Sequence, residues 1–310
     1  MNLEASLDHM TSELSDAIIA LLEKRTHSEK RTYGFEYEFL PREIIDRKRL
    51  DEIRACLPSC GFDADGDRFL SSNGMSITFE PGGQIEYCSP PIEGGDRSSV
   101  EALLGIIEEV NRKIHRSLGI LYLPVGYIPG RDKIPLCVTS KRYKRLQARM
   151  STCGTRGLDM MKGTASIHLH VVILDTREIL PIFKELAFLA KTVEFSMSSD
   201  RRDIWNHTDP TRCGMPLDNM AEVTDAHALI SRIVRFALLA VDINENLPFA
   251  EKSDITVDNF LYHLTTIFTD VRLNMKGPSL ELRTLDSLPL SKFMGKWDLF
   301  VSTFEHYPIT

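Results

Sequence analysis

The sequence predicts an α+β protein built on a curved, mainly antiparallel β-sheet that is flanked by helices. Several segments alternate apolar and polar residues, as strands with one buried face do. Segments with apolar residues three and four positions apart lie between them and predict amphipathic helices. Strands and helices do not alternate in the regular βαβ rhythm of a doubly wound parallel sheet. The 310 residues are expected to form a single domain, with an N-terminal helix at about 4–25 and a core at about 30–290.

The first half of the chain predicts a helix, a strand, a set of hairpins and a second long helix. Apolar residues recur at helical spacing over 4–25, and a polar joint follows. YGFEYEFL, residues 33–40, alternates strictly and predicts a half-buried strand. The other elements expected here are a short helix at 47–57, strands and turns at 62–89, and a long amphipathic helix at 97–118.

The second half mixes strands and helices in the same way. Ser253 is a good N-cap residue, so a helix is expected to begin there. SLELRTLD, residues 279–286, alternates as a strand. The remaining elements expected are strands at 120–126 and 164–174 and helices at 177–197, 222–241 and 290–306.

Composition excludes some classes of protein. The net charge is −7, from 37 basic and 44 acidic residues, whereas a nucleic-acid-binding protein would carry a basic surplus. The N-terminus lacks the basic and apolar regions of a secretory signal, and no segment approaches the roughly 20 apolar residues of a membrane span. The six cysteines show no zinc-ligand spacing. We expect a cytoplasmic protein with reduced thiols, no nucleic-acid partner and no membrane partner.

The segment ITFEPGGQIEYCS predicts a hairpin with one apolar and one polar face. A three-residue loop, Pro81 to Gly83, with a glycine in the left-handed conformation would pair Glu80 with Gln84 and Thr78 with Glu86. Because side chains alternate along strands, these four polar residues share one face. The other face carries Ile77, Phe79, Ile85 and Tyr87.

The same division recurs in three other predicted strands. Their polar faces carry Glu36 and Glu38 in GFEYEF, Ser166, His168 and His170 in TASIHLHVV, and Glu281 and Arg283 in SLELRTLD. With the hairpin, the four segments gather five glutamates, two histidines and one arginine, and no lysine. A solvated outer face is the alternative interpretation, but such faces usually mix charges because like charges opposite one another are destabilising.

This acid-rich, lysine-free pattern favours a metal and phosphate site. Carboxylate oxygens suit Mg²⁺ or Mn²⁺, and cations lying between glutamates would make their proximity tolerable. Arginine can hold a phosphate through two hydrogen bonds. No phosphate-binding loop of the Walker type is present. The sequence therefore predicts nucleotide chemistry on the polar face of a sheet.

Six segments, taken in order, resemble the glutamate–cysteine ligase family, most closely its plant and proteobacterial type. They are GFEYEF, FEPGGQIEYCSPP, KRYKRLQARMSTCGTRGLDMMKGTASIHLHV, RRDIWNHTDPTRCGMP, HLTTIFTDVRL and LELRTLD, and they extend from about residue 33 to 286. The resemblance implies a glutamine-synthetase-like catalytic fold and one carboxylate–amine ligase domain over 1–310. It implies that ATP phosphorylates a glutamate carboxylate, and that the amine of cysteine then attacks the acyl phosphate.

The resemblance also implies roles for individual residues. Arg283 matches the arginine that steadies the transferred phosphoryl group, and Glu86 is expected to act with it in catalysis. Arg212, in TDPTRCG, is similar to the arginine that holds the carboxylate of the amino-acid substrate. The implied Mg²⁺ ligands are Glu36, Glu38, Glu80, Glu86, His168 and Glu281. Arg272, Lys162 and Gln84 are further candidates for contacts with substrate or phosphate.

Several other residues have a structural and a functional interpretation. Cys153 and Cys213 are expected to be structural, since the proposed chemistry needs no protein nucleophile. His263 is expected in the core, and so is Trp205, although its ring could stack on a ligand. His207 could cap a turn or touch substrate. His170 shares a face with His168, and whether it binds metal stays open.

The chain departs from the family at three places. A histidine stands at 170, where the family commonly has asparagine. Met275 to Ser279 form a short insertion, and the chain ends 24 residues after Asp286. We therefore expect a trimmed substrate-selecting periphery. Glutamate and cysteine stay the expected substrates, and two alternatives follow. One is the same reaction with another amine or carboxylate, and the other is a silent relative that only binds nucleotide or amino acid. A homo-oligomer is compatible with the sequence.

Overall fold

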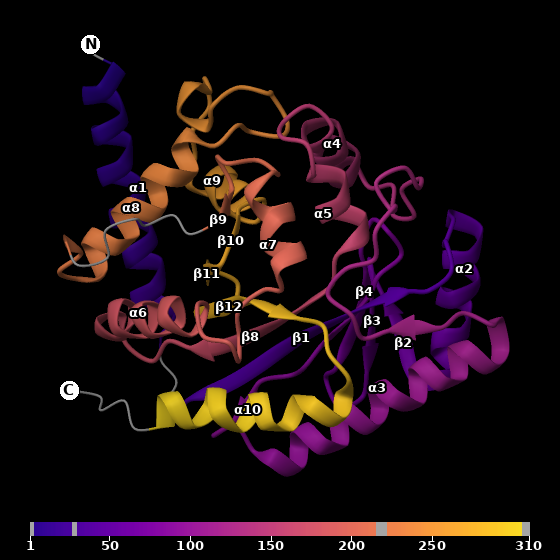
Figure 1. Ribbon diagram of the computed structural model, residues 1–310. Coiled ribbons are helices and arrows are strands. Elements are labelled where there is room, and N and C mark those ends of the chain that lie inside the picture. The colour runs from indigo at the N-terminus through magenta and orange to yellow at the C-terminus, as the bar shows by residue number, and fades with distance from the viewer. Residues whose placement is uncertain (1–2, 27–29, 215–221, 306–310) are drawn as a thin grey trace.

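The computed structural model describes residues 3–26, 30–214 and 222–305. Its central feature is a sheet of ten strands within these residues (Figure 1). The main path runs β11 (Val271–Asn274), β12 (Ser279–Asp286), β8 (Ser166–Val172), β1 (Thr32–Pro41), β5 (Ile85–Cys88), β4 (Ser76–Phe79), β3 (Arg68–Ser71) and β2 (Phe62–Asp65). Two short strands, β6 (Ile92–Glu93) and β7 (Tyr122–Leu123), also pair with β1. Neighbouring strands are antiparallel throughout, which confirms the predicted fold class.

Helices lie on both faces of this sheet (Figure 1). They are α1 (Leu3–Arg25), α2 (Arg47–Cys56), α3 (Arg97–Leu118), α4 (Lys141–Met150), α5 (Gly157–Gly163), α6 (Ile179–Leu189), α7 (Ser199–Asn206), α8 (Ala226–Leu239), α9 (Val257–Leu264) and α10 (Leu290–Glu305). Short 3-10 helices occupy Leu57–Cys60 (η1), Thr176–Glu178 (η2) and Phe249–Glu251 (η4). A separate parallel pair joins β9 (Cys213–Gly214) to β10 (Phe268–Thr269).

The apolar face of β1 is buried against α10. Tyr33, Phe35 and Tyr37 all point to this face, because they lie two residues apart on the strand. The Phe35 ring lies 5.1 Å from that of Phe293 and 5.9 Å from that of Trp297, in edge-to-face contacts. Burial of these aromatic rings fixes which side of β1 faces the helix. The residues between them therefore face the opposite layer, where α4, α5, α7 and α9 lie (Figure 1).

Local sequence signals explain where most of the helices begin and end. Asp96 caps the amino end of α3 by accepting a hydrogen bond from the Ser99 N–H, at 2.9 Å. Gly119 ends α3 in the left-handed conformation, with φ 68°. The predicted helices at 4–25, 47–57, 97–118 and 290–306 are confirmed within one residue at each end.

Three predicted boundaries were wrong. Ser253 does not cap a helix, because α9 begins only at Val257. Thr256 caps α9 by accepting a hydrogen bond from the Asn259 N–H, and the buried residues of this helix start at Phe260. The strand expected at 120–126 is reduced to β7, which pairs only with the end of β1. The helix expected at 177–197 ends at Leu189, where successive turns redirect the chain.

Two further predicted elements shift at their ends. The helix expected at 222–241 begins at Ala226, because the Asp225 side chain caps it there. The strand expected at 164–174 is β8, shortened by two residues at each end.

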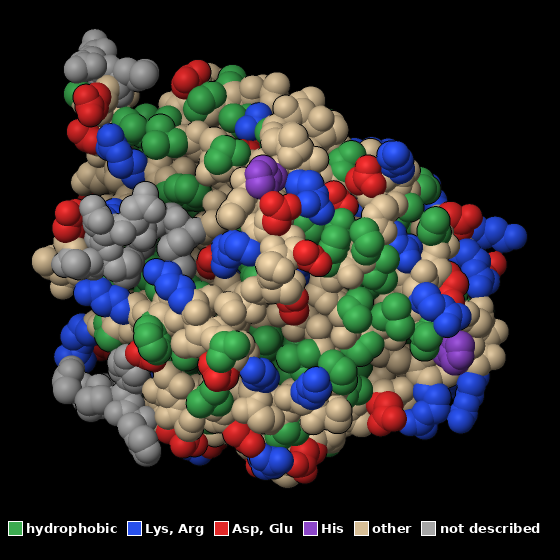
Figure 2. Space-filling view, in the orientation of Figure 1, with side chains coloured by type: hydrophobic (Ala, Val, Ile, Leu, Met, Phe, Trp, Pro, Cys, Tyr) green, Lys and Arg blue, Asp and Glu red, His purple; other side chains and the backbone are tan. Residues whose placement is uncertain are grey.

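The surface carries charges of both signs, and the thiols are unpaired. Lys and Arg side chains are interspersed with Asp and Glu over the face shown in Figure 2. All six cysteines are free thiols. Among the helices that the structure describes, none combines the length and apolarity needed to cross a bilayer.

Candidate functional site

The β4–β5 hairpin has the predicted three-residue loop. Glu80 donates its N–H to the Gln84 carbonyl at 3.0 Å, and Gly83, with φ 85°, donates to the Glu80 carbonyl at 2.9 Å. The tip of the hairpin packs against the end of α5. A Cβ on Gly82 would lie 2.2 Å from the carbonyl oxygen of Lys162, so only glycine fits there.

The sheet register aligns the polar faces of the predicted strands. Glu36 of β1 lies opposite His168 of β8, and Glu38 of β1 lies opposite Glu86 of β5. Farther along the sheet, Glu281 of β12 lies opposite both His170 of β8 and Arg272 of β11. Thr78 of β4 lies opposite Glu86. The side chains that the sequence predicted to converge therefore form one continuous row across six strands.

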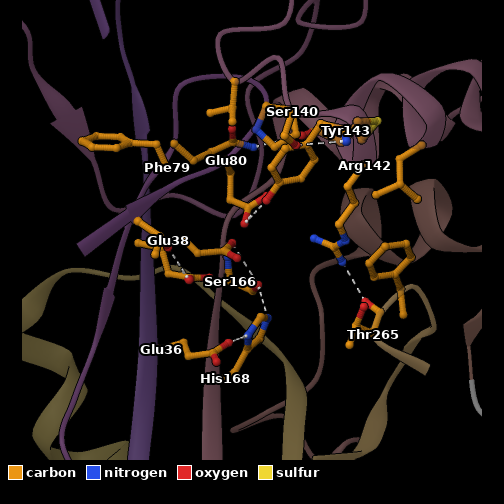
Figure 3. A pocket seen from close by; sticks show the side chains of 18 of the residues that line it. Glu36, Glu38, Phe79, Glu80, Ser140, Arg142, Tyr143, Ser166, His168 and Thr265 are labelled. Carbon is orange, nitrogen blue, oxygen red and sulfur yellow. Dashed lines mark hydrogen bonds and ion pairs between the residues drawn. The ribbon is translucent and has the colours of Figure 1, made fainter. Parts of the chain in front are cut away.

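Most of this row opens into a large pocket of about 1360 Å³ between the sheet and the α4–α9 side of the molecule (Figure 3). Glu36, Glu38, Glu80, Glu86 and His168 form its sheet side. The opposite wall is contributed by α4, α5, α7 and α9 and by the segment that follows α9, and includes Arg142, Tyr143, Met150, Met160, Trp205, Tyr262, Thr265 and Phe268. The pocket therefore has an anionic floor and a partly apolar wall.

Hydrogen bonds fix the orientation of the floor residues (Figure 3). His168 Nδ1 lies 2.5 Å from Glu36 Oε2, and His168 Nε2 lies 2.8 Å from Ser166 Oγ. Glu38 Oε2 accepts hydrogen bonds from the N–H of Ser166 at 2.6 Å and from its hydroxyl at 3.1 Å. Glu80 accepts from the Tyr143 hydroxyl. Each carboxylate thus keeps part of its acceptor capacity facing the pocket.

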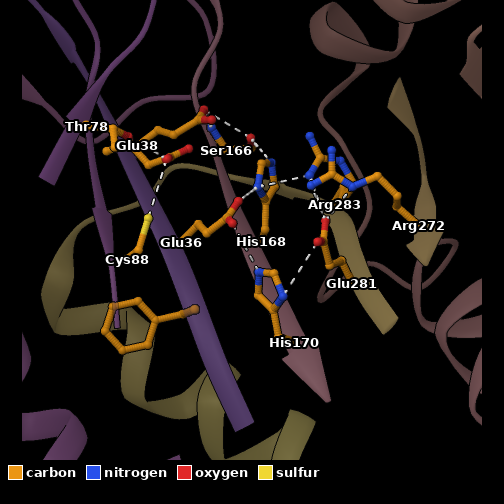
Figure 4. Close-up of polar contacts among 12 residues, drawn as sticks. Glu36, Glu38, Thr78, Cys88, Ser166, His168, His170, Arg272, Glu281 and Arg283 are labelled. Atoms are coloured by element: carbon orange, nitrogen blue, oxygen red, sulfur yellow. Dashed lines mark hydrogen bonds and ion pairs between the residues drawn. The ribbon is translucent and has the colours of Figure 1, made fainter. Parts of the chain in front are cut away.

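Glu281 lies at the inner end of the row, beside two arginines (Figure 4). Its Oε2 accepts hydrogen bonds from Arg272 Nε at 2.8 Å and from Arg283 at 2.9 Å. Its Oε1 is buried and has no hydrogen-bond partner among the described residues. His170 lies between Glu281 and Glu36. Arg272 and Arg283 line the pocket, whereas Glu281 lies behind them.

The carboxylates repel one another in the absence of cations. Burial, followed by repulsion from Glu36, Glu80 and Glu38, raises the pKa of Glu86 well above its usual range. Burial and the charge of Glu80 raise the pKa of Glu38 to about 7. Such mutual repulsion is relieved when divalent cations lie between the carboxylates. The electrostatics therefore favour a cation-binding interpretation over a solvated sheet face.

The two histidines differ in protonation. Burial, with the charge of Arg283, lowers the pKa of His168 to about 4, so that its ring is neutral, as a metal ligand must be. Burial also opposes the charged form of His170, but Glu281 and Glu36 outweigh it and raise its pKa. Burial disfavours ionised Glu36 as well, yet the hydrogen bond with His168 and the proximity of His170 hold its pKa well below its usual range.

The donor atoms fit divalent cations. Two groups of three residues bring one ligand atom each to within 4.8 Å of one another: Glu36, Glu86 and His168, and Glu36, His170 and Glu281. They share Glu36, whose two oxygens face different histidines. Carboxylate oxygen and imidazole nitrogen are ligands for Mg²⁺, Mn²⁺ and related ions. Glu38 and Glu80 lie on the same floor and could complete the ligand set.

Arg212 and Lys162, two predicted substrate contacts, do not line the pocket. Arg212 is fully buried and pairs with Asp209 at 2.9 Å, and it also donates to backbone carbonyls. Lys162 Nζ donates to the carbonyls of Asp132 and Ile134. The structure therefore uses both cations internally, and their predicted roles in substrate binding gain no support from their position.

Gln84 lines the pocket, but its amide group already has partners. Its oxygen accepts from the Gly82 N–H at 2.8 Å, and its nitrogen donates to the carbonyls of Met161 and Thr164. These bonds join the hairpin to the segment before β8. In this geometry Gln84 positions the hairpin.

The sequence did not single out two residues of the pocket wall. Tyr143 contacts Glu80, and Arg142 donates to the Thr265 carbonyl at 2.8 Å while its buried Nε has no hydrogen-bond partner among the described residues. Figure 3 shows the Arg142 guanidinium directed into the pocket, across from Glu80. Both residues lie on α4, which begins after the N-cap residue Ser140, and that residue was the signal available in the sequence.

Several histidines and cysteines and one tryptophan had both a structural and a functional interpretation, and the structure shows their surroundings. His263 is buried, as predicted, with Nε2 2.9 Å from the Ala237 carbonyl. Trp205 donates to the Phe268 carbonyl, and it also lines the pocket. His207 is exposed and lies 2.8 Å from the Asp203 carbonyl at the end of α7. Burial raises the pKa of the Cys153 thiol and raises that of Cys213 to about 12, so both stay protonated.

Comparison with known proteins shows the family of the chain. A model of glutamate-cysteine ligase family 2 matches residues 32–189, just over half of the chain. The chain belongs to glutamate-cysteine ligase family 2. The matched segment contains β1, the β4–β5 hairpin and β8, and therefore most of the floor of the pocket.

Several members of this family are similar to the chain over most of its length. The chain is 26% identical over 311 residues to the chloroplastic glutamate–cysteine ligase A of Oryza sativa subsp. japonica, with 86% of this chain and 60% of the relative covered. It is 27% identical over 308 residues to the chloroplastic enzyme of Solanum lycopersicum, covering 86% and 56%. It is 26% identical to that of Brassica juncea, covering 88% and 60%. The chain thus spans somewhat more than half the length of these relatives.

Proposed function

We propose that the protein is an ATP- and Mg²⁺-dependent ligase that forms an amide from a carboxylate and an amine. The simplest reaction joins the side-chain carboxylate of glutamate to the amine of cysteine and gives γ-glutamylcysteine, for glutathione biosynthesis. The observation that carries this proposal is the row of five glutamates, two histidines and two arginines on one face of the sheet. Family membership and the names of the relatives support the same reaction.

The reaction has two steps. The glutamate carboxylate attacks the γ-phosphorus of ATP, and the bond between that phosphorus and the ADP oxygen breaks, which leaves an acyl phosphate and ADP. The cysteine amine then attacks the acyl carbon, phosphate leaves, and the nitrogen loses a proton. Both steps require positioning and neutralisation of phosphate charge far more than a protein nucleophile.

The proposed roles follow from position in the pocket. Glu36, Glu38, Glu80, Glu86, His168 and Glu281 would hold the metal ions. Mg²⁺, or Mn²⁺, would neutralise the phosphate oxygens when bound. Arg283 and Arg272 lie at the inner end of the row, where their guanidinium groups can hold the transferred phosphoryl group through paired hydrogen bonds. Glu86 lies between Glu38 and Thr78 in the sheet and would help to hold a metal ion beside Arg283.

We further propose that residues 1–310 act as one ligase domain in the cytoplasm. Small molecules are its expected partners, and neither a membrane nor a nucleic acid is expected. The net charge of −7 supports the expectation that the protein does not bind nucleic acid. A homo-oligomer is compatible with this assignment.

A second candidate is the same reaction with a different amine or carboxylate. The turn between β11 and β12, which includes the insertion at Met275 to Ser279, places Met275 and Lys276 at the pocket. This feature would alter the shape and charge of the substrate side of the pocket. A silent relative is the weaker alternative, because every acidic residue of the proposed site is present.

The test is a product assay with the full chain. ATP, Mg²⁺, glutamate and a panel of amines including cysteine are supplied, ADP is measured, and the amide is identified by mass spectrometry. ADP and γ-glutamylcysteine are expected, and another amide would favour the second candidate. Absence of ADP with every pair of substrates would contradict the ligase proposal.

Two variants connect this assay to the site. Glu80→Gln should abolish ADP formation while the chain stays folded. Glu108→Gln, on the exposed side of α3, should leave the activity unchanged. Equal activity in both variants would contradict the role given to the hairpin.

A further inference from the structure

β12 is irregular at the point where Arg283 leaves the strand for the pocket. Its register against β8 shifts there, because Leu282 pairs with Leu169 whereas Leu285 pairs with Ile167. Such a bulge interrupts the hydrogen-bond ladder and re-aims side chains, and bulges are frequent beside active sites. The ladder alone therefore does not fix the direction of Arg283, and contacts from other elements decide it.

Two consecutive arginines of α7 make these contacts. Arg201 Nη1 donates a hydrogen bond to the Asp286 carboxylate at 2.6 Å and another to the Thr284 carbonyl at 3.3 Å. Arg202 holds the Asp270 carboxylate through two bonds, at 2.9 Å and 3.2 Å. Paired bonds of this kind fix geometry as well as adding energy.

Asp270 connects Arg202 to the bulge. Its backbone carbonyl accepts a hydrogen bond from the Arg283 N–H at 2.9 Å. Asp270 is buried, so its side chain and its carbonyl are both held within the protein. Arg283 is thus braced on its amino side through Asp270 and on its carboxyl side through Thr284.

The burial of Arg201 is not explained by packing. Its side chain is 1% exposed, and its Nε and Nη2 have no hydrogen-bond partner among the described residues. A buried cation with unpaired N–H groups costs free energy. Apolar residues of similar volume often serve stability as well as a buried ion pair or better. The guanidinium therefore has a use other than stability.

The same helix reaches the pocket through Trp205. The Arg201 Cζ atom lies 5.1 Å from the centroid of the Trp205 ring, one turn along α7, which is a cation–π distance. Trp205 and Arg283 both line the pocket. A ligand that contacts the indole therefore contacts the helix that braces Arg283.

We propose that Arg201 and Arg202 are positioning residues, which clamp the β12 bulge from α7 and so hold Arg283 in its direction toward the pocket. The consequence of this clamp for phosphoryl transfer rests on the proposed ligase function. The clamp itself does not, because its contacts are made without substrate.

The first test measures amide hydrogen exchange by mass spectrometry in the full chain without substrates. Arg202→Met should raise the exchange rate of residues 281–286 at least about tenfold, because Asp270 is released, while residues 290–305 keep their rate. Arg202→Lys, which keeps the charge and can still pair with Asp270, should lose only part of the protection. Arg112→Met, which alters an ion-paired arginine of α3, should match the unmodified protein.

The second test separates kcat from KM in the ligase assay. Arg201→Met and Arg202→Met should lower kcat by roughly tenfold to a hundredfold, because a misplaced Arg283 holds the transferred phosphoryl group poorly. The KM for ATP should stay close to that of the unmodified protein, since the lost interaction is made mainly in the transition state. If Arg201→Met fails to fold, as judged by circular dichroism, Arg201→Lys takes its place.

The two tests fail separately. Unchanged exchange of residues 281–286 in both arginine variants would overturn the proposal, and so would exchange that rises equally along the whole chain, which indicates a general loss of stability. A raised KM for ATP with an unchanged kcat would overturn the positioning of Arg283. Faster exchange confined to residues 281–286, in a protein that forms no amide, would support the clamp and contradict only the ligase function.

Discussion

The hydroxyl of Tyr143 lies 3.0 Å and 3.1 Å from the two carboxylate oxygens of Glu80. Tyr143 lies on α4 and Glu80 at the end of β4, so this contact joins the helical wall of the pocket to its sheet floor (Figure 3). Burial, followed by the charge of Glu80, raises the pKa of Tyr143 well above its usual range. The phenol therefore stays neutral and donates to the carboxylate.

Tyr143→Phe should weaken Mg²⁺–ATP binding by roughly tenfold, because Glu80 loses the donor that orients it. Isothermal titration calorimetry measures the change. Tyr127→Phe is the matched control, since its hydroxyl contacts Asp159 and Arg156 outside the pocket. Equal affinities for the two variants would show that the contact with Glu80 does not position a ligand.

Gly82→Ala should lower the free energy of unfolding by about 1–3 kcal/mol or more, since the new Cβ would lie 2.2 Å from the Lys162 carbonyl oxygen. Urea denaturation measures the loss. Gly105→Ala is the opposite case: this exposed glycine lies inside α3 with no atom within 4 Å of an added Cβ. That substitution should stabilise the protein by about 0.5–1 kcal/mol. A neutral effect of Gly82→Ala would mean that the hairpin tip and α5 are not closely packed.

Arg212→Met should lower the free energy of unfolding by about 3–5 kcal/mol, because it leaves the buried Asp209 with one fewer partner. Thermal and urea denaturation measure the loss. Arg235→Met, which breaks only an exposed ion pair with Asp8, should change it by less than about 1 kcal/mol. A stable Arg212 variant with weakened glutamate binding would instead support the substrate contact that the family resemblance implied.

His263 should make stability depend on pH. Burial lowers its pKa to about 4, whereas an unperturbed histidine titrates near 6.5. The unfolded chain therefore takes up the proton first, and the contribution of neutral His263 is present above about pH 6.5 and lost as the pH falls toward 4. The melting temperatures of the protein and of His263→Asn should converge over this interval. A difference in melting temperature between the two proteins that stays constant from pH 8 to 4 would contradict this assignment. Other titrating groups contribute equally to both proteins and so cancel from the difference.

Much of the sheet could be predicted because its strands have one apolar and one polar face. The strict alternation of residues 33–40 was sufficient for β1, and the Pro-Gly-Gly loop fixed the pairing of Thr78 with Glu86. The convergence of the polar faces followed from charge pattern, and the family resemblance supplied roles. The register that places His168 opposite Glu36 involves residues more than 100 positions apart, and no local signal specifies it.

The helical wall could not be predicted as well. α4 is mostly basic and polar, with only Leu146 and Met150 buried, so its apolar period is weak. α5 has seven residues and begins and ends with glycine. The internal roles of Arg212 and Lys162 depend on partners brought near by the fold, which residue type alone does not indicate.

Because the side chains of β8 alternate between two faces, substitutions in the core can affect the residues that line the pocket. Ile167 and Leu169 are fully buried on the side of the strand that faces away from the proposed cation ligands. A slip by a single position would turn these aliphatic groups toward the pocket and bury the imidazoles among apolar side chains. Tight packing of the apolar face of β8 thus fixes the register of its polar face. Substitutions that loosen it should impair metal affinity without altering any ligand.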